Sequence, residues 1–208
     1  MLKAKNFRLE AWEKLRGKWG TFALIAFIHS LIMGVCGALT YIYVGEIITL
    51  LVGGPFALGL AMIALNVVRT RKVEVNQLFS GFREFGKAFI VNLLNSILIV
   101  LWTLLLIIPG IIKSFSYSMS YYILADEPTL TATEIRHRSI ELMRGNKWRL
   151  FCLEVSFIGW WILCILTLGI LSFWIIPYQQ SAIAAFYQSL LPKVEATTPQ
   201  VETGQAEG

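Results

Sequence analysis

The stretch that decides the fold is AFIVNLLNSILIVLWTLLLIIPGIIKSFSYSMSYYILA, which runs from Ala88 to Ala125. As one straight helix it would be about 57 Å long at 1.5 Å per residue, whereas the hydrocarbon core of a bilayer is about 30 Å thick. Pro109-Gly110 interrupts the stretch near its middle, and this dipeptide is typical of a chain reversal. We therefore predict two apolar helices joined by a tight turn. Whether the shorter arm, Ile111–Ala125, spans completely is left open.

Apolar segments of similar length lie on both sides of this stretch. The chain has 208 residues, of which 56% are hydrophobic and 15% charged, whereas a soluble domain carries about 25% charged residues. The predicted fold class is all-α, a polytopic membrane helix bundle within residues 1–193, followed by a disordered cytoplasmic tail at residues 194–208. Six membrane segments in three hairpins are expected: Thr21–Tyr43, Ile47–Val68, Ala88–Ile108, Ile111–Ala125, Leu150–Leu168 and Ile170–Leu191.

The positive charges are distributed asymmetrically about these segments. All Lys and Arg residues except Lys113 fall in the blocks Lys3–Lys18, Arg69–Lys87, Arg136–Arg149 and Lys193. Because cytoplasmic loops of membrane proteins carry the excess of Lys and Arg, we expect both termini in the cytoplasm of a multi-pass plasma membrane protein. The charges flank apolar segments and form no separate basic face, so nucleic acid is not an expected partner.

A cytoplasmic amphipathic stretch precedes each predicted hairpin. These stretches end in glycine at Gly17, Gly86 and Gly145, and each glycine is expected to end an interfacial helix. Thr131 and Glu134 form a capping-box pattern that is expected to begin the third of these helices. The recurrence suggests an internal repeat of three units, but any helix that enters a membrane attracts Gly, Lys and Trp, so the repeat is left open. The candidate lipid-contacting residues, which we call the basic collar, are Lys18, Trp19, Lys87, Arg144, Lys147 and Trp148.

Polar side chains near the predicted bilayer midplane are candidates for function. They are His29, Gln179 and Gln180, and polar groups at this depth are rare in membrane proteins. They either line a cavity or form hydrogen bonds between helices, and the second interpretation is preferred.

Other polar candidates lie nearer the two membrane surfaces. Glu154 is expected at the depth of Asn92 and Asn95, whose amides are candidate hydrogen-bond donors to its carboxylate. Lys113 is expected to extend its amine to the outer interface, because a lysine close to a helix end reaches water along its own alkyl chain.

No catalytic set accompanies these residues. His29 and His137 are far apart in the predicted topology, and the chain has no nucleophile elbow, phosphate-binding loop or zinc-protease motif. Asp126-Glu127, followed by Pro128, is expected to terminate the fourth segment. We expect neither enzymatic activity nor a metal or cofactor.

Four stretches carry a resemblance to a known family. They are LLLIIPGIIKSFSYSMSYYILADEP (Leu104–Pro128), RGNKWRLF (Arg144–Phe151), SFIGWWILCILTLGIL (Ser156–Leu171) and PYQQSAIAAFY (Pro177–Tyr187). Together they resemble the bacterial integral membrane family catalogued as domain of unknown function nine-seven-five, over roughly residues 2–190. More remotely, the chain is similar to the membrane domain of bacterial glycerophosphodiesterases. Neither resemblance implies an activity for any residue.

Two functions follow from these observations. The preferred one is a non-enzymatic membrane module that binds anionic lipid, or a membrane-protein partner or second copy of the chain, through the basic collar. The alternative is a small transporter or channel, because the apolar segments carry prolines as well as midplane polar groups, and interrupted helices at membrane depth are where substrate sites form.

Overall fold

The computed structural model describes residues 4–38, 45–70, 73–167 and 169–191, and within these ranges all regular structure is helical. The prediction for the tail at residues 194–208 falls outside the described residues. The elements are α1 (Ala4–Leu15), α2 (Trp19–Ala38), α3 (Gly45–Thr70), α4 (Asn76–Ser80), the 3₁₀ helix η2 (Gly81–Glu84), α5 (Phe85–Leu105), α6 (Ile107–Tyr117), α7 (Ser120–Asp126), α8 (Ala132–Leu142), α9 (Lys147–Val155), α10 (Ile158–Leu166) and α11 (Ser172–Leu190).

The all-helical class is confirmed, and part of the predicted membrane topology has matching helices. Three stretches are long and apolar enough to cross a membrane, namely Leu50–Thr70, Asn76–Leu105 and Lys147–Leu166. A fourth is added if α1 and α2, which meet at 101°, count as one bent span. The predicted segment Ile111–Ala125 is divided between α6 and α7, and the last segment corresponds to α11. Six crossings therefore remain a prediction.

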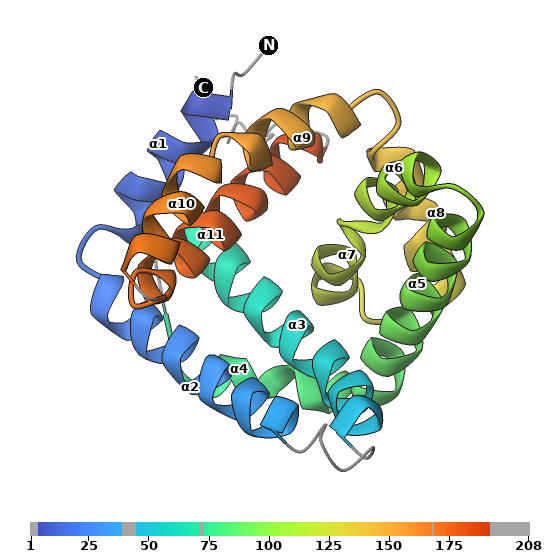
Figure 1. Cartoon of the computed structure of the whole chain (residues 1–208), viewed down its shortest axis with the longest axis horizontal. Helices are drawn as coiled ribbons and strands as arrows, with labels where there is room; N and C mark the ends of the chain where they lie inside the picture. Colours follow the sequence, from blue (N-terminus) through green and yellow to red (C-terminus); the bar gives the residue numbers. More distant parts are fainter. Residues whose placement is uncertain (1–3, 39–44, 71–72, 168, 192–208) are drawn as a thin grey trace, which may run out of the picture.

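The helices pack in a ring around α3 (Figure 1). In the 18-residue apolar part of the Leu50–Thr70 span, 67% of the residues are buried in the protein, against 17% and 22% in the corresponding parts of the other two spans, so α3 is the central helix. Contacts join α2 to α3, α5 to α6, and α10 to α11, and further contacts join α3 to α5, α6 to α9, and α11 to α2. The short helix before each pair packs on the last helix of the neighbouring pair: α4 packs on α3, α8 on α7, and α1 on α11. This cyclic recurrence supports the predicted repeat of three units.

The predicted glycine ends of the interfacial helices hold at two of three positions. Gly17 follows α1 with φ 82° and Gly145 follows α8 with φ 78°, the left-handed conformation that ends a helix. Gly86 is different, because it lies inside α5 and the helical stretch Asn76–Leu105 continues through it. The second interfacial helix is therefore continuous with the membrane span, and the prediction of a separate helix is wrong at this position.

The turn within Ala88–Ala125 also differs from its predicted position. The chain reverses at Leu106, whose backbone is extended, and Pro109 is the third residue of α6. A proline is tolerated there because the first backbone N–H groups of a helix have no partner within it. Gly110 faces α5 so closely that a Cβ atom would lie 2.8 Å from the Cα atom of Thr103. This glycine permits the close packing of α5 and α6.

Candidate functional site

Polar side chains from separate helices meet at one cavity with a volume of about 350 Å³. We call it the polar cavity. Its lining comes from α2, α3, α7, α9, α11 and the link between α6 and α7, so distant parts of the chain build it together. The polar members of the lining are His29, Ser118, Tyr121, Tyr122, Glu154 and Gln180.

One wall of the polar cavity is made by small residues of α3. Gly53, Ala57 and Ala61 follow one another at intervals of four and lie on one helical face. Because these residues are small, they leave open space beside the helix. Larger apolar side chains, such as Leu150 of α9, complete the wall.

Tyr121 is held at the cavity by an amide behind it. Its hydroxyl donates a hydrogen bond of 2.9 Å to Asn92 Oδ1, and Asn92 Nδ2 donates one of 3.0 Å to the Leu50 carbonyl oxygen. Asn92 therefore has partners other than Glu154, which the sequence had proposed as its acceptor. Asn95 is buried on the same helix but does not line the cavity.

The two neighbouring glutamines have different surroundings. Gln180 lines the polar cavity, and its Oε1 atom accepts a hydrogen bond of 2.9 Å from the Tyr122 hydroxyl. Gln179 lies outside the cavity lining and accepts a hydrogen bond of 3.2 Å from Trp161 Nε1. Of the predicted midplane residues, His29 and Gln180 meet at one cavity, and Gln179 forms an interhelical bond.

Glu154 brings a carboxylate into this lining without a basic partner. The ion pairs among the described residues are Glu10–Lys14, Asp126–Arg69 and Glu127–Arg138, and Glu154 takes part in none of them. The lining of the polar cavity contains no Lys or Arg. His29 also belongs to the lining, and its ring packs edge-on against Phe56 at 5.7 Å between centroids.

A second polar cluster, the ion-pair network, joins the ends of α3, α7 and α11. Arg69 binds both carboxylate oxygens of Asp126 at 2.7 Å, and the Tyr187 hydroxyl donates to Asp126 at 3.0 Å. The ring of Tyr187 stacks on Tyr122 with 5.5 Å between centroids, and Tyr122 in turn binds Gln180 in the cavity. The network is thus in contact with a residue of the cavity wall.

The sequence had assigned Asp126 only to the end of the fourth segment. These residues share their position in the helix, because Arg69, Asp126 and Tyr187 all lie within three residues of the last residue of their helix. Contacts of α3 with α7 and with α11 bring these three ends together, and no local pattern in the sequence indicates that they meet.

Lys113 lies outside both clusters. Its Nζ atom is 4.9 Å from the centroid of the Trp102 ring, which is a favourable cation–π distance. This contact lies within the α5–α6 pair, and the extension of the Lys113 amine to the outer interface remains a prediction.

The residues of the basic collar differ in exposure. Lys18 and Arg144 are exposed, Lys147 is half-buried, and the half-buried Lys87 donates a hydrogen bond to the Pro128 carbonyl oxygen. Trp148 is 71% exposed although its ring stacks on Phe151. Among them, Trp19 contributes to an apolar pocket.

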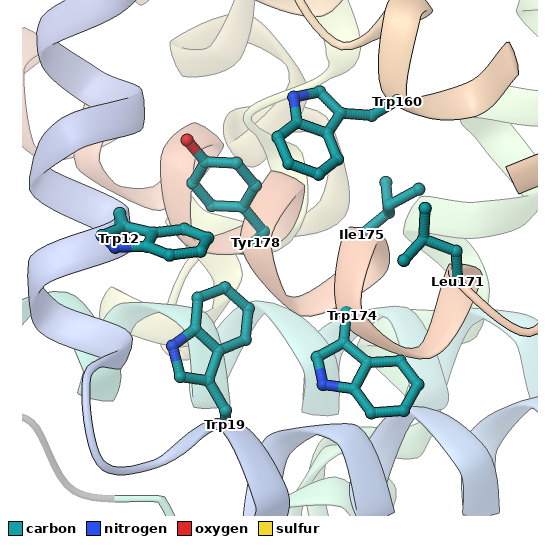
Figure 2. A pocket seen from close by; sticks show the side chains of 7 residues that line it. All are labelled: Trp12, Trp19, Trp160, Leu171, Trp174, Ile175 and Tyr178. Atoms are coloured by element: carbon teal, nitrogen blue, oxygen red, sulfur yellow. The ribbon is translucent and has the colours of Figure 1, made fainter. Parts of the chain in front are cut away.

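That pocket is apolar, has a volume of about 380 Å³, and lies where α1 bends into α2 beside α10 and α11. Figure 2 shows aromatic rings facing a common space, and we call it the aromatic pocket. Trp12 and Trp19 are 4.9 Å apart at their centroids, and Tyr178 makes an edge contact with Trp12 at 5.7 Å. The lining residues are Trp12, Trp19, Trp160, Leu171, Trp174, Ile175 and Tyr178.

A cation already lies behind the aromatic pocket. The Arg8 guanidinium is 6.0 Å from the Tyr178 ring centroid and 5.3 Å from that of Phe157, and its Nη1 atom donates to the Ser156 carbonyl oxygen at 3.2 Å. A second cation inside the pocket would be repelled by Arg8. The pocket therefore suits a neutral apolar group.

Comparison with known proteins identifies the family. No curated protein and no solved structure matches the chain, and no match supports the remoter resemblance to the membrane domain of glycerophosphodiesterases. A family model described as Protein of unknown function (DUF975) matches residues 1–114 and, in a second overlapping match, residues 103–193. Since these matches cover nearly all of the chain, the protein belongs to this family.

Proposed function

We propose that the protein is a multi-pass membrane protein that holds a small solute in the polar cavity and passes it across the bilayer, as a transporter or channel. One observation carries the proposal: six polar side chains from several helices line one cavity among apolar helices. Polar and ionisable groups inside a membrane bundle are costly, and they mark solute pathways by default. A volume of about 350 Å³ lies within the range of small-molecule sites, which is about 300–1,000 Å³.

The proposed topology retains six membrane segments in three hairpins, with both termini in the cytoplasm and the plasma membrane as the location. The one-sided distribution of Lys and Arg supports this orientation. The cyclic packing supports a common role for the three helix pairs, since each contacts the next in the same way. In this arrangement the polar cavity is enclosed by all three units.

Binding without chemistry is the proposed role of the cavity. A nucleophilic hydroxyl needs a base that accepts its proton. Ser118 donates to the Phe115 carbonyl oxygen, and Tyr121 and Tyr122 donate to amide oxygens, so none of these hydroxyls is paired with a base. We therefore propose a non-enzymatic protein.

The test is solute flux through reconstituted vesicles. Full-length protein in liposomes is expected to accelerate swelling, followed by light scattering, for some members of a panel of small polar solutes. Ala57→Phe places a ring in the cavity and is expected to return the rate to that of empty liposomes, whereas the matched control Ala57→Ser keeps the space open. Equal rates with and without protein for every solute, or no effect of Ala57→Phe, would refute the proposal.

A second function, binding of anionic phospholipid, is favoured by the aromatic pocket. The pocket suits an acyl chain, and the exposed Arg16 and Lys18 lie beside Trp19 on the same bend, where they suit a phosphate group. This proposal gives the basic collar a defined lipid site, and it is compatible with solute passage through the polar cavity.

Native mass spectrometry of protein from mixed-lipid nanodiscs tests the lipid site. We expect anionic lipid to be retained over neutral lipid, and Trp19→Ala together with Lys18→Gln to remove the preference. Trp148→Ala is the control, because Trp148 belongs to the basic collar but not to the aromatic pocket. Equal retention of neutral and anionic lipid by the wild-type protein would exclude this second function.

A further inference from the structure

We infer that the polar cavity selects an organic cation, namely a protonated amine that carries a short apolar body. This inference rests on the proposed function and specifies its substrate class. It follows from three properties of the lining: its charge, the use of its hydroxyl protons, and the distribution of apolar surface.

The charge of the lining favours a cation. The groups that titrate among the lining residues are His29 of α2, Tyr121 and Tyr122 of α7, and Glu154 of α9, while α3 and α11 contribute none. Glu154 is thus the one carboxylate in the lining, and no Lys or Arg of the lining balances it. A cationic ligand supplies the missing opposite charge, whereas an anion would meet the carboxylate directly.

The hydroxyl groups of the lining are arranged as hydrogen-bond acceptors. Tyr121 donates its proton to Asn92, Tyr122 donates to Gln180, and Ser118 donates to the Phe115 carbonyl oxygen. Each hydroxyl proton is therefore committed to a protein partner, and the oxygen keeps lone pairs for a ligand. An ammonium group has donors and no acceptor, so it matches these hydroxyl oxygens, whereas a carboxylate or phosphate ligand would find the hydroxyl protons already donated.

The size and the apolar wall indicate an organic cation. A cavity of about 350 Å³ is far larger than the share of one water molecule in the liquid, about 30 Å³, so a bare metal ion would leave most of it unfilled. Gly53, Ala57, Ala61 and Leu150 provide an apolar wall for an alkyl body. A short primary alkylammonium ion combines both requirements.

Calorimetric titration of the full-length protein in detergent tests this inference with three probes of similar shape: n-butylammonium, n-pentanol and pentanoate. We expect n-butylammonium to bind the wild-type protein about tenfold or more tightly than either other probe, which is the range of one charge-assisted hydrogen bond. Glu154→Gln is expected to remove this preference and Glu154→Asp to retain it. The matched control Glu13→Gln changes an exposed carboxylate of α1 and is expected to have no effect.

The possible results test the selectivity for cations separately from the existence of the solute site. If n-pentanol or pentanoate binds as tightly as n-butylammonium and Ala57→Phe abolishes that binding, the selectivity for cations is refuted while the solute site stands. A preference that survives Glu154→Gln in a variant that melts like the wild type also refutes it. If no probe binds and no solute crosses reconstituted vesicles, the solute site itself is refuted.

Discussion

The bond between Arg69 and Asp126 is expected to hold the ends of α3 and α7 together. The pair is bidentate with both distances at 2.7 Å, and its side chains are 38% and 17% exposed. A hydrogen bond to a charged group contributes about 1.5–3 kcal/mol when it is shielded from water. Because more than a third of Arg69 is exposed, solvent screening reduces the sum, and we expect a coupling energy of about 2 kcal/mol.

A double-mutant cycle of Asp126→Asn and Arg69→Gln measures this coupling, because both substitutions nearly keep the size of the side chain. The free energy of unfolding is followed by thermal melting in detergent, where about 1 kcal/mol corresponds to about 2–4 °C for a chain of this length. Asp126→Asn is therefore expected to lower the melting temperature by about 4–8 °C, with a smaller effect for Tyr187→Phe, which removes one hydrogen bond.

The pair Arg138–Glu127 is the control for this cycle. Its single bond has the same length of 2.7 Å, but its side chains are 46% and 36% exposed, so we expect a coupling of about 0–1 kcal/mol. A coupling energy for Arg69–Asp126 no larger than that of the control pair would refute the argument that this network holds the helix ends together.

Two further predictions concern backbone packing and pH. Gly81→Ala is expected to destabilise the fold by about 1–3 kcal/mol, because its Cβ atom would meet the Pro55 carbonyl oxygen of α3, whereas Gly86→Ala has open space and is expected to stabilise α5 by about 0.5–1 kcal/mol in the same melts. The Thr131 backbone N–H, and then its hydroxyl, lower the pKa of Glu134. The capping box is therefore complete above the ordinary carboxyl pKa and is lost as pH falls through the lowered one, so amide exchange at the start of α8 should accelerate in acid in the wild type but show no such pH step in Glu134→Gln.

Features set by nearby residues were predictable from the sequence. The all-helical class follows from long apolar segments, and the left-handed Gly17 and Gly145 follow from the usual end of a helix. The capping box of Thr131 and Glu134 is confirmed in both of its hydrogen bonds. In each case the signal and the structure lie within a few residues of each other.

The incorrect predictions of helix ends and turns came from residues that are compatible with more than one local structure. Glycine was expected to end a helix at Gly86, but the residues after it continue the helical turn of α5, and an interior glycine costs only about 1 kcal/mol. Proline was expected to mark the reversal at Pro109, but it is equally compatible with the first turn of α6.

The candidate site could be predicted only as separate residues. His29, Glu154 and Gln180 were each identified because they are polar residues in an apolar segment. Their positions in the segments predict their depth in the membrane, but they do not predict which helices are neighbours. The contacts of α11 with α2 and α3 join residues far apart in the chain, and these contacts create the polar cavity. Ala57 gives no clearer signal, since a small residue is compatible with either close packing or open space.

Water access to the polar cavity is the most direct test of the proposal. In protein whose native cysteines are replaced, Ala57→Cys lies in the cavity wall, whereas Ala64→Cys lies on the same helix at a position that is 0% exposed and outside the lining. Labelling by a small charged thiol reagent in intact membranes should modify position 57 and spare position 64. Equal protection of both positions would contradict a solute site within this protein.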